Sequence, residues 1–118
     1  SIHQNSYTSP QIKGAQVFYY TTSKESQELA ETVQKTLIEQ VDPDNHRQAK
    51  ANDSYYLLKK TESAIIIVEC GFLSNPEEAQ KLTEEAYQQQ MADAICTGIF
   101  QYLGKDTDTK DMDTNTQS

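Results

Sequence analysis

One carboxylate in this sequence follows directly after a buried strand, where it is well placed to do chemistry. Residues 64–68 read Ala-Ile-Ile-Ile-Val, with no polar side chain, which predicts a central strand buried on both faces. Glu69 comes next, at the predicted carboxyl end of that strand, where ligands and catalytic groups gather in open α/β sheets. Position alone leaves two interpretations open: a catalytic group, or a glutamate that ends a strand in solvent.

Two histidines are the other candidates for chemistry. His3 directly follows an apolar residue. A lone histidine near a terminus is usually solvated and without a function, and the alternative interpretation is that His3 is a zinc ligand. His46 is the weaker metal candidate, because no acid or histidine stands at ligand spacing in its polar loop. A zinc hydrolase needs three protein ligands and a separate base, so the residues alone predict only an α/β domain with a poised carboxylate.

The elements that must position these residues follow from turn and periodicity signals. A glycine-led apolar run predicts a strand over 14–20, and Thr22 and Ser23 offer caps for an amphipathic helix that ends at 42–45. Residues 46–54 read as a loop and 55–58 as a short strand. Gly71 then lets the chain leave the central strand sharply, and a cap, a proline and two acids start a helix over 75–82.

A longer helix is predicted to follow, with Thr83 as its cap and Gly104 as its stop. One stripe of that helix is apolar and is expected to pack on the core: Tyr87, Met91, Ala94, Ile95, Ile99, Tyr102 and Leu103. The predicted fold class is therefore α/β, with helices packed on a mixed, mostly parallel twisted sheet in three layers. We expect a domain over 1–104 and an acidic, disordered tail over 105–118.

Composition excludes several classes of partner. The chain has 118 residues, a net charge of -8 and a single arginine, which makes nucleic acid an unsuitable ligand. No apolar run approaches the length of a membrane span. Cys70 and Cys96 are too far apart for a metal-binding pair, and we interpret them as two buried free thiols, with a disulfide as the alternative.

The sequence resembles a known family at two motifs. Ser-Ile-His-Gln-Asn at 1–5 and Val-Glu-Cys-Gly-Phe-Leu-Ser-Asn at 68–75 are similar to motifs of the zinc-dependent N-acetylmuramoyl-L-alanine amidases, most closely the CwlD-like amidases of spore formers. The resemblance runs from Ser1 to about Leu103. It implies a peptidoglycan hydrolase that acts in the cell wall or spore cortex, secreted or extracytoplasmic.

The resemblance also implies roles for individual residues. His3 matches a zinc ligand of the family, and Glu69 matches its catalytic glutamate, which serves as general base and then acid. Zn²⁺ is the implied cofactor, and the implied substrate bond joins N-acetylmuramic acid to L-alanine of the stem peptide. Asn5, Gly71 and Phe72 lie in the same motifs and are expected to contact the glycan strand or the peptide.

Two further zinc ligands of the family, a histidine and a glutamate, have no counterpart in the sequence. We therefore expect the chain to be the carboxyl-terminal part of an amidase catalytic domain, inactive by itself, with part of the sheet missing. An upstream segment or an activating protein is expected to complete it. The alternative is a non-catalytic wall-binding or partner-binding fragment without a complete zinc site.

Overall fold

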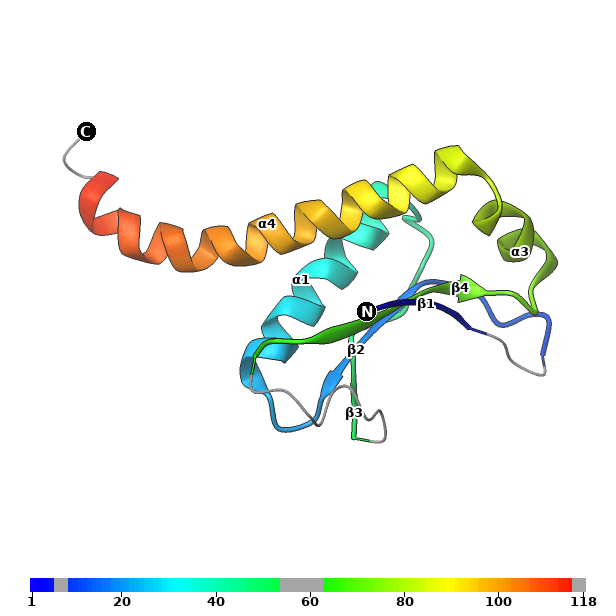
Figure 1. The fold of residues 1–118 in the computed structure, drawn as a ribbon, viewed down its shortest axis with the longest axis horizontal. Helices are drawn as coiled ribbons and strands as arrows, with labels where there is room; N and C mark the ends of the chain where they lie inside the picture. Colours follow the sequence, from blue (N-terminus) through cyan, green and yellow to red (C-terminus); the bar gives the residue numbers. More distant parts are fainter. Residues whose placement is uncertain (6–8, 54–62, 116–118) are drawn as a thin grey trace.

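The computed structural model describes residues 1–5, 9–53 and 63–115, except for the side chains of residue 5 and residues 105–115. Figure 1 shows helices lying over a small sheet, with one long helix extending beyond it. The elements in chain order are β1 (Ile2–Asn5), β2 (Gln16–Tyr20), α1 (Lys24–Gln40), β3 (Lys50–Asn52), β4 (Ile66–Phe72), α3 (Pro76–Leu82) and α4 (Glu85–Asn115).

The sheet is mixed, and β4 lies inside it. Its strand order is β1-β4-β2-β3. β1 runs parallel to β4 and β2 runs parallel to β3, whereas β2 and β4 are antiparallel. The predicted α/β fold with a mixed, mostly parallel sheet is therefore confirmed. All seven residues of β4 are buried, as the apolar run predicted for a central strand.

Helix α1 is fixed to the sheet by apolar packing and by one buried amide. Ser23 caps the helix, since its Oγ accepts the N–H of Ser26 at 3.2 Å. In the second half of the helix, Gln34 is buried; its Oε1 accepts the N–H of Val17 at 2.8 Å and its Nε2 donates to the carbonyl of Ala15 at 3.1 Å. These bonds fix the register of α1 along β2.

Helix α4 crosses α1 at a glycine. A Cβ added at Gly98 would lie 2.7 Å from Oγ1 of Thr36 and 2.8 Å from the Cα of Val33, so only glycine allows this approach. Thr36 is fully buried and donates to the carbonyl of Ala94 at 2.8 Å across the crossing. The two helices therefore form one layer over the sheet (Figure 1).

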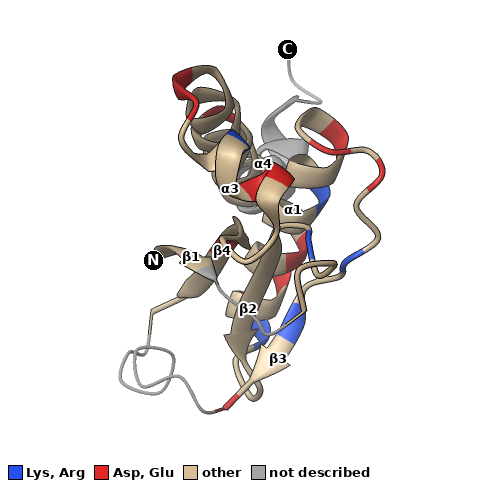
Figure 2. Cartoon of the chain, turned by 90° about the vertical axis from the view of Figure 1, so that its right-hand side faces the viewer, with Lys and Arg blue, Asp and Glu red and all other residues tan. Residues whose placement is uncertain are grey.

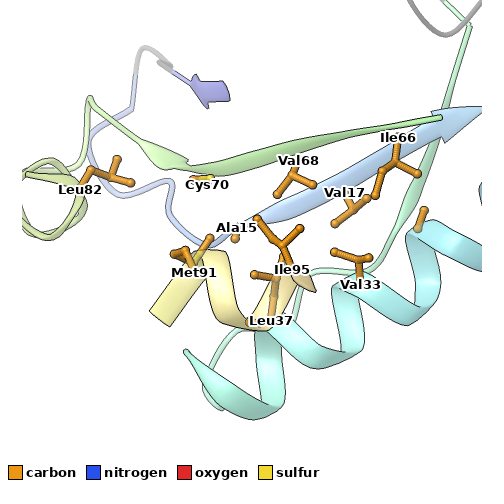
Figure 3. Close-up of a cluster of buried hydrophobic side chains, with 12 residues drawn as sticks. Ala15, Val17, Val33, Leu37, Ile66, Val68, Cys70, Leu82, Met91 and Ile95 are labelled. Carbon is orange, nitrogen blue, oxygen red and sulfur yellow. The ribbon is translucent and has the colours of Figure 1, made fainter. Parts of the chain in front are cut away.

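The hydrophobic core lies between this layer and the sheet. Figure 3 shows side chains of β2 and β4 meeting those of α1 and α4. The cluster also includes residues from the segment before β2 and from α3, and its members are Ala15, Val17, Ala30, Val33, Leu37, Ile66, Val68, Cys70, Leu82, Met91, Ala94 and Ile95. The sheet and these helices make two layers among the described residues, and the third layer of the predicted fold stays a prediction.

Several sequence predictions differ from the structure. The loop predicted over 46–54 contains β3, which pairs with β2 through its backbone although its own sequence, Lys-Ala-Asn, has little strand character. The strand predicted over 55–58 lies outside the described residues. Thr83 ends α3 rather than capping α4.

The end of α4 also differs from its prediction. The helix continues through Gly104 to Asn115, because a single glycine within a helix costs only about 1 kcal/mol. The apolar stripe is buried at Met91, Ala94 and Ile95 but exposed at Ile99 and Leu103, beyond the crossing with α1. The division at residue 104 into a domain and a disordered tail stays a prediction.

Acidic side chains gather on the helices. Figure 2 shows red segments mainly on α1, α3 and α4 and few on β1, β2 and β4.

Within the part of the chain that the structure describes, no helix is both long enough and apolar enough to cross a membrane.

Candidate active site

Glu69 lies within β4, on the face of the sheet that the helices do not cover. Successive side chains of a strand point to opposite faces, and Val68 and Cys70 belong to the core beneath α1 and α4. Glu69 therefore points the other way. The predicted end of the strand at Val68 is wrong, because pairing with β1 carries β4 on to Phe72.

His3 lies beside Glu69 on the neighbouring parallel strand. The two residues are register partners, so their side chains share one face of the sheet and their Cα atoms are about 5 Å apart. The His3 side chain is exposed, and its Nε2 forms a short hydrogen bond with Oγ of Ser1. Two residues that are 66 positions apart in the chain are thus brought together.

Glu69 is buried and incompletely hydrogen-bonded. Its residue surface is 7% exposed, and its Oε2 has no hydrogen-bond partner among the described residues. Burial raises the pKa of Glu69 above its ordinary value, and the nearby charge of His3 acts in the opposite direction. A carboxylate with a raised pKa and a free oxygen is suited to accept and return a proton.

A bulge follows Glu69 in β4. His3 lies opposite Glu69, but Asn5 lies opposite Phe72, so β4 uses one residue more than β1 over this interval. Gly71 lies in the bulge with a φ of +157°, and a Cβ there would meet the Glu78 carboxylate at 3.3 Å. The backbone and the Glu78 carboxylate therefore both favour glycine at position 71, and the contact of Gly71 with substrate stays a prediction.

Glu78 holds this bulge in place from the start of α3. Asn75 caps α3 by accepting the N–H of Glu78 at 3.1 Å, as the sequence predicted. The Glu78 carboxylate does not complete a capping box, however; it accepts the N–H of Gly14 at 3.0 and 2.9 Å and that of Phe72 at 2.9 Å. Sequence analysis missed this role, because the residue stands at the usual position of a capping acid.

On the other side of Glu69 lies Gln16 of β2, its antiparallel register partner. Oε1 of Gln16 accepts a hydrogen bond from Nη1 of Arg47 at 3.0 Å. The Arg47 guanidinium also covers the Phe72 ring, with 4.9 Å between Cζ and the ring centroid. Phe72 is buried and lies outside the helix-side core, so the bulge has turned it toward this face. Sequence analysis did not single out Gln16 or Arg47.

The remaining predicted residues are less informative. Asn5 lies on β1, but its side chain is outside the described part of the structure. His46 is exposed on the loop between α1 and β3 and lines a cavity of about 470 Å³ together with Arg47 and Asp42, and neither His3 nor Glu69 lines it. Among the described residues, no three His, Cys, Asp or Glu side chains lie close enough together to hold a metal ion.

The two cysteines are free thiols, and only one of them is buried. Cys70 lies in the core and Cys96 is exposed on α4, so the predicted burial is confirmed for the first and wrong for the second. Burial and the adjacent Glu69 raise the pKa of Cys70 to about 11, which keeps it protonated and excludes it as a nucleophile at neutral pH.

Comparison with known proteins places this arrangement in a family. Residues 1–101 match the family model described as N-acetylmuramoyl-L-alanine amidase. The chain belongs to this amidase family. It is 36% identical over 103 residues to the germination-specific N-acetylmuramoyl-L-alanine amidase of Bacillus subtilis, covering 87% of this chain and 43% of that protein.

Solved structures of the family share the fold. The CwlD amidase from Clostridioides difficile, solved in complex with the GerS lipoprotein, is 42% identical with a TM-score of 0.86, covering 87% of this chain and 52% of that one. An N-acetylmuramoyl-L-alanine amidase from Clostridium difficile 630 is 34% identical with a TM-score of 0.82, covering 87% and 55%. The chain thus spans about half the length of the relatives it matches, and its sheet is part of that fold's sheet.

Proposed function

We propose that the protein carrying this chain hydrolyses the amide bond between N-acetylmuramic acid and L-alanine of the peptidoglycan stem peptide. Membership of the amidase family supports the substrate class. The observation that carries the proposal is the pairing of His3 with Glu69 on one face of the sheet, where Oε2 of the buried carboxylate has no partner among the described residues.

The described residues fit one part of a zinc site. His3 offers an imidazole at the exposed side of Glu69, and the unpartnered Oε2 is an acceptor beside it. When bound, zinc would polarise the scissile carbonyl and make the attacking water more acidic. The described residues gather no set of three ligands, so the proposal requires further ligands from outside this part of the chain.

Glu69 is the proposed general base and acid. Its carboxylate removes a proton from the attacking water as the water oxygen bonds to the amide carbon, and it then gives that proton to the leaving nitrogen of L-alanine as the C–N bond breaks. The raised pKa of Glu69 favours the first half of this exchange, because it makes the carboxylate a stronger base toward the attacking water.

The partners and the location follow from the substrate. Peptidoglycan lies outside the cytoplasm, so we propose an extracytoplasmic site of action. The likeness to a germination-specific amidase favours spore cortex as the substrate. A protein partner is part of the proposal because a relative was solved in complex with a lipoprotein and because this chain alone lacks a described ligand set.

Removing one carboxylate tests the role of Glu69. In the full-length protein, Glu69→Gln should reduce release of stem peptide from purified peptidoglycan by about a thousandfold or more, without changing zinc content. Glu77→Gln removes an exposed acid from α3 and is the matched control. Comparable activity in the two variants would remove Glu69 from the mechanism.

The two histidines provide a second matched pair. His3→Ala should lower zinc content and activity together, whereas His46→Ala, an exposed loop substitution, should leave both unchanged. If the full-length wild-type protein binds peptidoglycan but releases no stem peptide under any zinc supply, the non-catalytic binding function replaces the amidase.

A further inference from the structure

Arg47 is held in place by three contacts, one of them with Gln16, the register partner of Glu69. Its Nε donates to the carbonyl of Lys13 at 2.8 Å, and its Nη1 donates to Oε1 of Gln16 at 3.0 Å. Its guanidinium lies against the buried Phe72 ring. A side chain with many rotamers is thereby fixed in one orientation, so the entropy cost of ordering it is met before any ligand arrives.

None of these contacts neutralises the charge of Arg47. The partners are a carbonyl, an amide and an aromatic ring. Within the described residues the ion pair that forms is Lys35 with Glu39, on the exposed side of α1. Arg47 is the only arginine in a chain of net charge -8. Asp42, Asp44 and Glu77 line the same cavity as Arg47, but none of these described carboxylates forms an ion pair with it. Two of its five N–H donors bind described residues, which leaves donors for an anion.

The position of Arg47 matches the reach of a peptide substrate. Gln16 lies one strand away from Glu69, about 4.8 Å, and Arg47 is one hydrogen bond beyond the Gln16 amide. In a stem peptide the residue after L-alanine is D-glutamate, linked through its side chain, so its α-carboxyl is free. That carboxylate lies two residues from the scissile bond, roughly 7 Å in an extended chain.

We propose that Arg47 binds the free α-carboxylate of the second stem-peptide residue and so makes the enzyme prefer D-glutamate over D-isoglutamine at that position. The inference rests on the proposed amidase function, because that function places the peptide across Glu69 and Gln16. A planar guanidinium suits a carboxylate through two parallel N–H bonds, and an amide can satisfy only one of them.

Two matched muropeptides test this preference, one with D-glutamate and one with D-isoglutamine. The full-length wild-type protein should cleave the acid form with a kcat/KM at least about tenfold higher. Arg47→Met keeps an apolar stem on Phe72 and should reduce that ratio to about one, mainly by slowing cleavage of the acid form. Lys13→Met removes a neighbouring charge but leaves the carbonyl that accepts from Arg47, so its ratio should match the wild type.

Two results would overturn the inference: equal cleavage of both substrates by the wild-type protein, or equal losses on both in Arg47→Met, which indicates a structural role. Arg47→Lys retains the charge if the methionine variant fails to fold, and it should keep part of the preference. Calorimetry with the two released stem peptides separates the proposals. If the acid peptide binds more tightly but the protein releases no stem peptide from either muropeptide, the amidase function is contradicted and the carboxylate site remains supported.

Discussion

Two buried glutamates nine positions apart have opposite surroundings. Glu78 is 6% exposed, and its carboxylate accepts hydrogen bonds from the backbone N–H groups of Gly14 and Phe72. Glu69 is 7% exposed, yet its Oε2 has no partner within the described structure. Both glutamates are therefore buried, but only the Glu78 carboxylate has hydrogen-bond partners for both of its oxygens among the described residues. The satisfied carboxylate holds the bulge in place, and the unsatisfied one shares a face of the sheet with His3.

Truncating the satisfied carboxylate should have the largest effect on stability. Glu78→Ala leaves the N–H groups of Gly14 and Phe72 buried without acceptors, so we expect the free energy of unfolding to fall by about 3 kcal/mol. Urea denaturation measures the loss, with Glu77→Ala as the exposed control. A loss below about 1 kcal/mol would show that Glu78 is not the organiser of the bulge.

Gly71→Ala should have the next largest effect, because it presses on the same carboxylate. The added Cβ would lie 3.3 Å from Oε1 of Glu78, which is held by its own hydrogen bonds, and the φ of +157° disfavours alanine. We expect a loss of about 1–2 kcal/mol. In a Glu78→Ala background the same substitution should cost less, and a double-mutant cycle measures this coupling. Additive losses would contradict it.

Glu69→Gln should stabilise the protein by about 1 kcal/mol at pH 7, because a neutral amide replaces a buried carboxylate that has an unpartnered oxygen. Thermal or urea unfolding of the two full-length proteins, both freed of metal, gives the difference. Loss of stability in the variant would mean that Glu69 is satisfied in the folded state, like Glu78.

The gain in stability from Glu69→Gln should depend on pH. The folded-state pKa of Glu69 is raised above its ordinary value of 4.5, so its contribution to stability is fully present below 4.5 and is lost as pH rises through the folded value. The advantage of Glu69→Gln over the wild type should therefore be small near pH 4 and grow toward neutral pH. Unfolding curves at a series of pH values check this, and a gain that shrinks with pH would oppose it.

The parts of the site that lie in contiguous motifs could be predicted from sequence. The apolar run before Glu69 predicted a buried central strand, and the cap and proline predicted α3. The family resemblance pointed to His3 and Glu69, which the strand register then brings together. Their catalytic roles remain predictions.

The remaining parts depend on long-range contacts that no local pattern records. Glu78 looks like a capping acid until the bulge and the loop at Gly14 are in place. Arg47 sits in a polar loop, and only the pairing of β2 with β4 and β3 brings it beside Gln16. The continuation of β4 past Glu69 likewise comes from pairing with β1, which overrides the glycine as a stop.

The pKa of Glu69, followed by carbon NMR of its carboxyl group in metal-free full-length protein, tests the central claim most directly. We predict a wild-type value above 4.5 that rises further in His3→Ala, since the charge of His3 lowers it, and that does not move in His46→Ala. A Glu69 pKa at or below 4.5, or one that is the same in His3→Ala as in the wild type, would contradict a buried, unpartnered carboxylate that shares a site with that histidine.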